Sequence, residues 1–179
     1  MNKRVIKNIT LSILPLILLL TSIGTLTIYT YTLNKEDRKI ENALEYETCE
    51  LLKVVDGDTL FVEINGKKEY VRLLNVDTPE SVNPNENLNT EEGKFASNFV
   101  KELLKNTKTL YLTKDVSDRD KYGRLLRLVW LKIPISDSKE EIKNYTLNGI
   151  LVKNKIARVV VYDDYRYYRE LSEIENGNH

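Results

Sequence analysis

Three short segments carry charged residues whose types could do chemistry together. They are Val55–Thr59 (VDGDT), Val71–Glu80 (VRLLNVDTPE) and Asp120–Arg124 (DKYGR). Asp58 and Asp77 are hard oxygen ligands that could share one Ca²⁺, and such an ion would polarise a phosphoryl oxygen. Arg72 and Arg124 offer planar donor forks that match phosphate oxygens, and Glu80 could orient or deprotonate a water molecule. Taken together, these residues predict hydrolysis of a phosphodiester.

Each segment taken alone also has a simpler explanation. Asp56-Gly57-Asp58 is a common turn sequence in which Asp accepts backbone hydrogen bonds. Thr78 followed by Pro79 could begin a helix. Arg72 and Arg124 could be structural ion-pair partners of Asp58 or Asp77, because an arginine within an apolar strand needs a partner if it faces inward.

The composition excludes several kinds of chemistry. The single cysteine, Cys49, cannot form an intrachain disulfide or a cysteine-based zinc cluster. The single histidine is the last residue, His179, so histidine triads and histidine-bound zinc are also excluded. We interpret Cys49 as a small buried or semi-exposed residue without a role.

The charge distribution argues against a generally basic nucleic-acid-binding surface. The formal net charge of the 179 residues is zero, with 27 basic and 27 acidic residues. Three of the basic residues, Lys3, Arg4 and Lys7, lie at the start, so the rest of the chain is slightly acidic. Any phosphate contact must therefore come from a few placed cations.

The N-terminal segment predicts export or anchoring. Residues 9–31 are apolar or hydroxylic, long enough to cross a bilayer, and preceded by the basic residues. We interpret residues 1–33 as a signal peptide or a membrane anchor, and residues 34–47 as a polar linker. Both alternatives place the rest of the chain outside the cytoplasm, secreted or on the outer face of the membrane.

Residues 48–179 alternate between strand and helix patterns. Residues 50–55, 59–64 and 69–76 are β-prone, and Asn65-Gly66 predicts a type I′ hairpin turn. After Thr90, an N-cap, a helix is expected over 91–106 with Phe95, Phe99, Leu103 and Leu104 on one face. Further strands are expected at 109–112, 125–131 and 157–161, and further helices at 140–154 and 165–175. This order predicts an α+β, mainly β fold: a five-stranded OB-fold Greek-key barrel with about three packed helices.

The three segments in this order resemble the staphylococcal nuclease, or thermonuclease, family. The resemblance covers Cys49 to about Ser172 and rests on DGDT at 56–59, RLLNVDTPE at 72–80 and DKYGR at 120–124. It implies a monomeric OB-fold nuclease that uses Ca²⁺ to cleave DNA and RNA, leaving 3′-phosphates.

The resemblance also implies a role for each matching residue. Calcium would be bound by Asp58 and Asp77 through their carboxylates and by Thr78 through its backbone carbonyl. Arg72 and Arg124 would contact the scissile phosphate, with Glu80 as general base. Lys121 and Tyr122 would hold the adjacent phosphate, and Tyr162 is the closest match to a base-stacking tyrosine.

The sequence departs from the family pattern in several places. The loop at 82–87 is not basic, about a dozen extra residues lie at 133–146, and the last helix ends early near Gly177. Tyr162, Tyr165, Tyr167 and Tyr168 could form a stacking platform for bases or could pack in the core.

A second class of function fits a barrel of this kind. The chain could be a membrane-tethered, non-catalytic OB-fold module that only binds nucleic acid. A binding module does not need Asp58, Arg72, Asp77, Glu80 and Arg124 together, so their joint presence favours the enzyme.

Overall fold

The computed structural model describes residues 25, 44–81, 90–161 and 166–177. Leu44–His179 forms one compact unit, which is the subject of the following paragraphs. Apart from Thr25, the predicted signal or anchor segment 1–33 lies outside the described residues, as do residues 34–43 of the predicted linker. Among the helices that are described, none has the length and apolar character needed to cross a bilayer.

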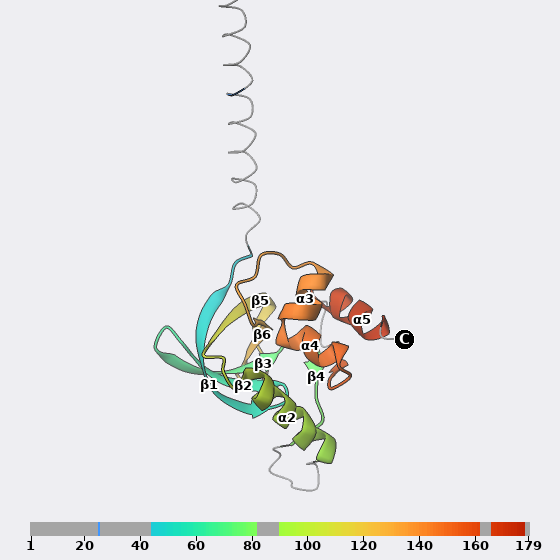
Figure 1. Ribbon diagram of the computed structural model, residues 1–179. Helices are drawn as coiled ribbons and strands as arrows, with labels where there is room; N and C mark the ends of the chain where they lie inside the picture. Colours follow the sequence, from blue (N-terminus) through green and yellow to red (C-terminus); the bar gives the residue numbers. More distant parts are fainter. Residues whose placement is uncertain (1–24, 26–43, 82–89, 162–165, 178–179) are drawn as a thin grey trace, which may run out of the picture. The chain divides into compact units, whose positions relative to one another are not determined.

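The centre of this unit is a closed mixed β-barrel (Figure 1). Its strands follow the order β1-β2-β3-β6-β5. They are β1 Glu47–Asp56, β2 Thr59–Ile64, β3 Lys67–Leu73, β6 Leu125–Trp130 and β5 Thr109–Arg119. All neighbours are antiparallel except β3 and β6, which run parallel. This arrangement agrees with the predicted OB-like barrel.

Alternating side chains explain why these segments form a barrel. In β2, Leu60, Val62 and Ile64 are buried inside, while the residues between them face outward. The β2–β3 hairpin turns at Asn65 and Gly66, which both have positive φ angles of 50° and 77°. Positive φ at both central residues is the requirement of a type I′ turn, so the predicted hairpin is confirmed.

Strand β1 bends so that it can pair on both sides. Its first half pairs with β5 and its second half with β2. The register against β2 shifts between Leu51 and Lys53 and again between Val54 and Asp56. Such irregularities add bend and twist to a strand, which allows the barrel to close.

The described residues form four α-helices in this unit. They are α2 Glu91–Leu104, α3 Lys139–Tyr145, α4 Leu147–Lys153 and α5 Tyr168–Asn176. In Figure 1, α3, α4 and α5 gather on one side of the barrel. The single helix expected over 140–154 is wrong: Thr146 has extended φ and ψ angles of −105° and 146°, and it caps α4 by accepting a hydrogen bond from Gly149 N–H. The extra residues at 133–146 therefore include a separate short helix.

The predicted apolar face of α2 is only partly correct: Leu104 is buried and Phe99 packs against the core, but Phe95 and Leu103 are exposed. Gly93, Ala96, Ser97, Val100 and Leu104 are the buried residues of this helix, while Phe95 is 63% exposed. Small side chains on the buried side let the helix lie close to the chain that leads into the site. A search for large apolar residues missed this face because close approach needs small residues.

Polar side chains hold the helices to the barrel at buried points. Asn148 in α4 is fully buried; its Oδ1 accepts from Val129 N–H at 3.0 Å and its Nδ2 donates to the Leu74 carbonyl at 2.8 Å. Trp130, also fully buried, donates from Nε1 to Thr113 Oγ1 at 2.8 Å. The buried polar groups of Asn148 and Trp130 therefore have partners, which avoids the cost of leaving them unpaired.

A second, two-stranded sheet lies beside the barrel. It pairs β4 Val76–Asp77 with β7 Arg158–Val159, and Asp77 lies opposite Arg158. Asn75 has a positive φ of 55° and joins its backbone and side chain to Val160. This small sheet fixes the chain immediately before Thr78 and Glu80.

Candidate active site

The three segments singled out from the sequence meet at one end of the barrel. The connection Gly57–Asp58 joins the end of β1 to the start of β2, and Arg72 lies opposite Thr59 near the end of β3. Strand β6 begins beside this point, because Val71 pairs with Leu125 in parallel. Arg124, the residue before β6, is therefore brought to the same end.

Arg72 bridges the two predicted metal ligands. Its Nη1 lies 2.7 Å from Asp58 Oδ2, and its Nη2 lies 2.9 Å from Asp77 Oδ1. Nη1 also donates to the Val76 carbonyl at 2.9 Å. The Arg72 side chain is only 10% exposed, so these contacts lie largely out of water. The carboxylates of Asp58 and Asp77 are thus within reach of a single guanidinium group.

Asp58 is held by donors from two segments. Its Oδ2 accepts from both the backbone N–H of Thr78 at 2.9 Å and the Thr78 hydroxyl at 3.0 Å. Its Oδ1 accepts from the Thr59 hydroxyl at 3.1 Å. These bonds fix the carboxylate orientation and join the first segment directly to the second.

Gly57 allows this close approach. A Cβ atom at residue 57 would lie 2.7 Å from Thr78 Oγ1 and 3.0 Å from the Cβ of Ala96. A side chain at residue 57 would therefore displace the hydroxyl that donates to Asp58. The glycine in the DGDT segment is explained by packing against Thr78 and helix α2.

Asp77 has a second cationic partner that the sequence did not suggest. Arg158 donates from Nε at 3.2 Å and from Nη2 at 2.9 Å to Asp77 Oδ2. The Arg158 side chain is 75% exposed, whereas that of Asp77 is 27% exposed. The contact follows from the pairing of β4 with β7, two strands too short to be recognised from sequence patterns.

Asp56 and Ser81 were also missed as members of the site. Both the hydroxyl and the backbone N–H of Ser81 donate to the Asp56 carboxylate, which also accepts from Gly57 N–H. Asp56 therefore ties the β1–β2 connection to the chain just beyond Glu80. The position of Asp56 in the DGDT segment could have indicated that it belongs to the site. Nothing in the sequence identified Ser81 as the partner of Asp56.

Glu80 lies where α2 meets the site. Its backbone carbonyl accepts from Thr90 N–H at 2.9 Å, next to the first turn of the helix. Partial burial raises the pKa of the Glu80 carboxyl, and the negative charges of Asp56, Asp58 and Asp77 raise it further, against an opposing effect of Arg72. The Glu80 carboxyl is thus electrostatically part of the same acidic group.

Asp120 positions Arg124. The Asp120 carboxylate accepts from Arg124 Nε at 2.7 Å and from the backbone N–H groups of Tyr122 and Arg124. Burial raises the pKa of the Asp120 carboxyl, but these hydrogen bonds outweigh burial and leave the pKa below its usual range. From this turn, Arg124 Nη1 reaches Thr59 Oγ1 at 3.4 Å. The third segment therefore contacts the residue beside Asp58.

The predicted substrate-binding residues lie around this turn. Tyr122 is 72% exposed, with Lys121 Nζ 5.0 Å and Arg124 Cζ 5.5 Å from its ring centroid. Lys121 is exposed to solvent as well. Tyr162 and Tyr165 lie outside the described residues, whereas Tyr167 is buried and packs in the core.

The donor set fits a hard divalent cation. Asp58 and Asp77 supply carboxylate oxygens that the Arg72 guanidinium already brings together. The chain from Asn75 to Glu80 is held by backbone hydrogen bonds at both ends, from Val160 to Asn75 and from Thr90 to Glu80. No group of three or more His, Cys, Asp or Glu side chains arranged to hold a metal occurs in the described part of the chain. A bound ion would therefore need oxygens of another kind, such as the Thr78 carbonyl or water.

Cys49 is buried away from solvent, and burial raises the pKa of its thiol to about 12, which fits a residue without a chemical role.

Comparison with known proteins identifies relatives that match most of this chain. The family described as staphylococcal nuclease homologue matches residues 70–178 of this chain. The thermonuclease of Staphylococcus hyicus is 36% identical over 137 residues, covering 76% of this chain and 73% of that protein. The thermonuclease of Staphylococcus intermedius is 38% identical over 136 residues, with the same coverage. Endonuclease YncB of Bacillus subtilis is 39% identical over 132 residues, covering 73% of this chain and 54% of that protein.

Proposed function

The chain belongs to the staphylococcal nuclease family, and from this premise we propose that it is a calcium-dependent nuclease that hydrolyses phosphodiester bonds of DNA and RNA. The relatives are named thermonuclease and endonuclease, which supports a nucleic-acid substrate. The observation that carries the proposal is the Arg72 bridge. It gathers two carboxylates and a planar donor at the end of the barrel that Arg124 also reaches.

Asp58, Asp77 and the Thr78 carbonyl would hold the cation. When bound there, calcium supplies a Lewis acid that polarises a phosphoryl oxygen. Asp58 contributes a carboxylate already oriented by Thr59 and Thr78. Little rearrangement of the chain is therefore required to present its oxygens.

Arg72 and Arg124 would stabilise the charge that develops on the phosphate. Arginine offers several N–H donors in one plane, so Arg72 can hold the acids and still present a donor to a phosphate oxygen. Arg124 is held by Asp120 on its Nε side, which leaves its Nη groups directed towards Thr59. Donors fixed before the reaction stabilise a transition state more than donors that must reorient.

Glu80 would accept a proton from the attacking water. Its backbone is fixed by α2, and its carboxyl lies close enough to Asp56 and Asp58 to feel their charges. Attack of that water on phosphorus, with departure of the 5′ oxygen, leaves a 3′-phosphate and a free 5′-hydroxyl. Lys121 and Tyr122 would hold the neighbouring phosphate from their exposed turn.

The location proposed for the enzyme is outside the cytoplasm. The support is the basic start followed by the apolar residues 9–31. Protease added to intact cells should degrade the nuclease domain without lysis. A domain protected until the cells are lysed contradicts this location.

The function is tested with the full chain and end-labelled DNA and RNA. Calcium should support cleavage and excess chelator should abolish it, with products ending in 3′-phosphate. Asp77→Asn should raise the Ca²⁺ concentration needed for half-maximal rate. Undiminished cleavage in chelator refutes the calcium requirement. Binding without cleavage under all these conditions favours the non-catalytic module.

A further inference from the structure

An aromatic pair lies on the outer face of the barrel, next to the candidate active site. Three residue pairs of β2 and β3 lie on the face of the strands that points away from the barrel interior: Thr59 opposite Arg72, Phe61 opposite Tyr70, and Glu63 opposite Lys68. Of these, Thr59 and Arg72 are covered by the site and are buried. The residues that alternate with them in β2 are buried inside the barrel. The Phe61–Tyr70 pair therefore lies two residues along the strands from the buried Thr59–Arg72 pair, on the same face of the sheet.

The two rings contact each other, with Tyr70 exposed to solvent and Phe61 partly buried. Their centroids lie 4.7 Å apart with the planes inclined by 38°, and Tyr70 is 49% exposed. Two residues along a strand span about 7 Å. A polynucleotide whose phosphate lies at Arg72 would therefore have the base of a neighbouring nucleotide within reach of Tyr70.

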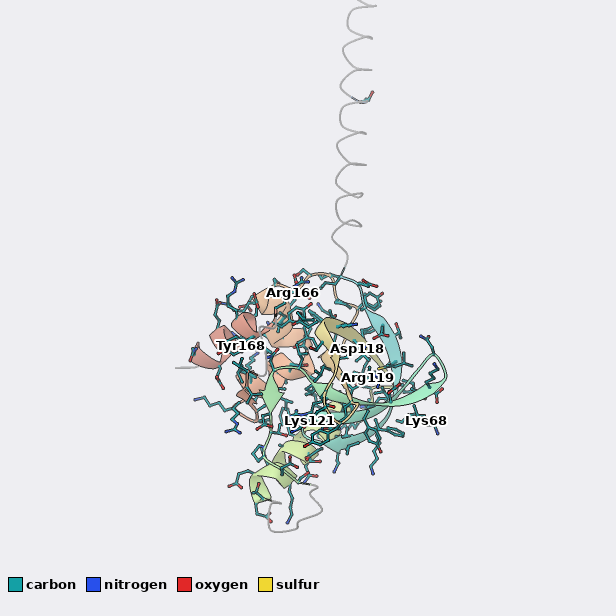
Figure 2. All side chains as sticks on the ribbon, turned by 180° about the vertical axis from the view of Figure 1, so that it is seen from behind. Lys68, Asp118, Arg119, Lys121, Arg166 and Tyr168 are labelled. Carbon is teal, nitrogen blue, oxygen red and sulfur yellow. The ribbon has the colours of Figure 1, made fainter. Side chains whose placement is uncertain are left out.

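The charges around the pair suit the backbone of the same polynucleotide. Lys53 in β1 lies opposite Phe61, and both Lys53 and Lys68 are exposed. Figure 2 shows Lys68 on the projecting β2–β3 hairpin. The nearby Glu69 carboxylate is occupied by two hydrogen bonds from Arg119, while Glu63 faces Lys68 across the strands. Cations beside an exposed aromatic surface are the combination that binds single-stranded nucleic acid.

We propose that Phe61 and Tyr70 form a base-stacking subsite for a single-stranded segment of the substrate, next to the phosphodiester bound at Arg72. The inference rests on the proposed nuclease function and adds a preference for unpaired bases. Only an unpaired base presents its face to a protein ring, so the subsite contributes to single-stranded substrates and not to intact duplex. It is separate from Tyr122 and from Tyr162, which belong to other segments of the chain.

If the Phe61–Tyr70 pair has only a structural role, a different result is expected. Cross-strand aromatic pairs stabilise hairpins, so loss of the ring would lower stability without changing substrate affinity. The affinity for single strands, measured on folded protein, separates the two roles.

The test compares Tyr70→Val, Tyr70→Phe and Tyr46→Val in the full chain. Tyr46 is a matched control because it is 38% exposed and also contacts another ring, that of Tyr111. It precedes the first residue of β1, whereas the candidate site lies at the last residue of that strand, Asp56. Tyr70→Val should raise KM for an oligothymidylate about tenfold, with kcat unchanged. Tyr70→Phe should stay within about twofold of the wild type, because the ring is retained. On duplex DNA, Tyr70→Val should leave KM unchanged.

An unchanged KM for Tyr70→Val on single strands overturns the subsite. So does an equal rise with Tyr46→Val or on duplex DNA. If Tyr70→Val fails to fold, a photo-crosslink decides: an oligonucleotide carrying iodouracil should label Phe61 or Tyr70 of the wild-type protein, and labelling confined to other segments overturns the proposal. A wild-type protein that neither binds nor cleaves nucleic acid refutes the proposed function itself, whereas a cleaving wild type with an indifferent Tyr70→Val refutes only the subsite.

Discussion

A single arginine, Arg72, holds the acidic residues of the site together. Two carboxylates brought close to each other repel, and a buried guanidinium between them offsets that repulsion. Arg72 is therefore a structural ion-pair partner of Asp58 and Asp77, and we propose that it is also the phosphate donor. A guanidinium group has five N–H donors, so the ion pairs do not exclude the proposed phosphate contact.

Replacing Arg72 by lysine separates charge from geometry. Lysine keeps the positive charge but loses the planar fork that joins Asp58 to Asp77. Arg72→Lys should lower kcat on the order of 10²- to 10³-fold, as loss of one preorganised donor does. Thermal unfolding measured beside the rate shows whether the protein is still folded. Arg169→Lys, a change in an exposed arginine of α5 paired with Glu170, is the control and should retain the wild-type rate. Full kcat in a stable Arg72→Lys protein excludes a role for the fork in the reaction.

Arg158 would compete with the proposed cation for Asp77. Its guanidinium donates twice to Asp77 Oδ2 and is mostly exposed, so its charge is partly screened by water. Arg158→Gln should raise the Ca²⁺ affinity of the full chain about two- to fivefold at low ionic strength, and less at high salt. Calorimetric titration without substrate measures this directly. Arg169→Gln removes an equally exposed arginine paired with Glu170 and should have no effect. A lower affinity in Arg158→Gln would mean that Arg158 orients Asp77 for the ion.

At the scale of elements, α2 and the chain before it support each other. Gly93 in the first turn of α2 packs against the Pro79–Glu80 backbone, where a Cβ atom would lie 2.0 Å from the Glu80 carbonyl oxygen. The helix N-terminus therefore sets the position of Glu80, in addition to the hydrogen bond from Thr90. A glycine inside a helix is otherwise unfavourable, which fits a packing reason for its presence.

Gly93→Ala should therefore disturb both stability and catalysis. The added methyl group must push α2 away from Glu80, which should cost on the order of 1–3 kcal/mol of unfolding free energy. The rate should fall as well, because Glu80 moves with its backbone. Denaturant unfolding and kcat on the same preparation provide the two measurements. Lys94→Ala changes an exposed residue of the same turn and should stay within about 0.5 kcal/mol of the wild type. Unchanged stability and rate in Gly93→Ala would show that the contact relaxes without cost.

Local sequence signals predicted some elements well and others poorly. The Asn65-Gly66 turn and the Thr90 cap depend on neighbouring residues, and both occur as expected. The break at Thr146 depends on Trp130, which pairs with Thr146 across an isolated bridge, so helical periodicity alone could not reveal it. In the site, the residues of the three segments could be recognised from the sequence by their residue types. Arg158 and Ser81 could not, because they contact Asp77 and Asp56, which are far from them in the sequence. Only the folded chain brings these partners together.

At the scale of the whole domain, ion pairs join parts of the fold that are far apart in the chain. Arg127 in β6 is almost completely buried and contacts Glu47 of β1 and Asp118 of β5. Arg119 joins β5 to Glu69 of β3, and Lys139 joins α3 to Glu173 of α5. These contacts are electrostatic links across the barrel and between helices. Protonation of their carboxyl groups should weaken several of them together.

The acid dependence of stability follows from the directions of the pKa shifts. Hydrogen bonds from Arg127, Arg119 and Lys139 hold the pKa values of the Asp118, Glu69 and Glu173 carboxyls below their usual ranges. The unfolded chain therefore binds more protons than the folded one in the acid range, so stability rises with pH there. This contribution is complete above the ordinary carboxyl pKa values and is lost from about pH 5 downwards. Glu80, whose pKa is raised, acts in the opposite direction but is a single group.

We therefore expect the urea unfolding free energy of the wild type to fall as the pH is lowered from about 6 to 3. The asparagine side chain in Asp118→Asn cannot ionise. The variant should therefore be less stable than the wild type near pH 6, and the two unfolding free energies should become similar near pH 3. The two curves should converge because the wild-type Asp118 is protonated there and its pairing with Arg127 is lost in both proteins. Glu45→Gln, a change in an exposed carboxyl before β1, should run parallel to the wild type. If the curves of Asp118→Asn and the wild type are parallel, the charge of Asp118 does not contribute to stability through its contact with Arg127. The acid sensitivity of the fold would then come from other carboxyl groups.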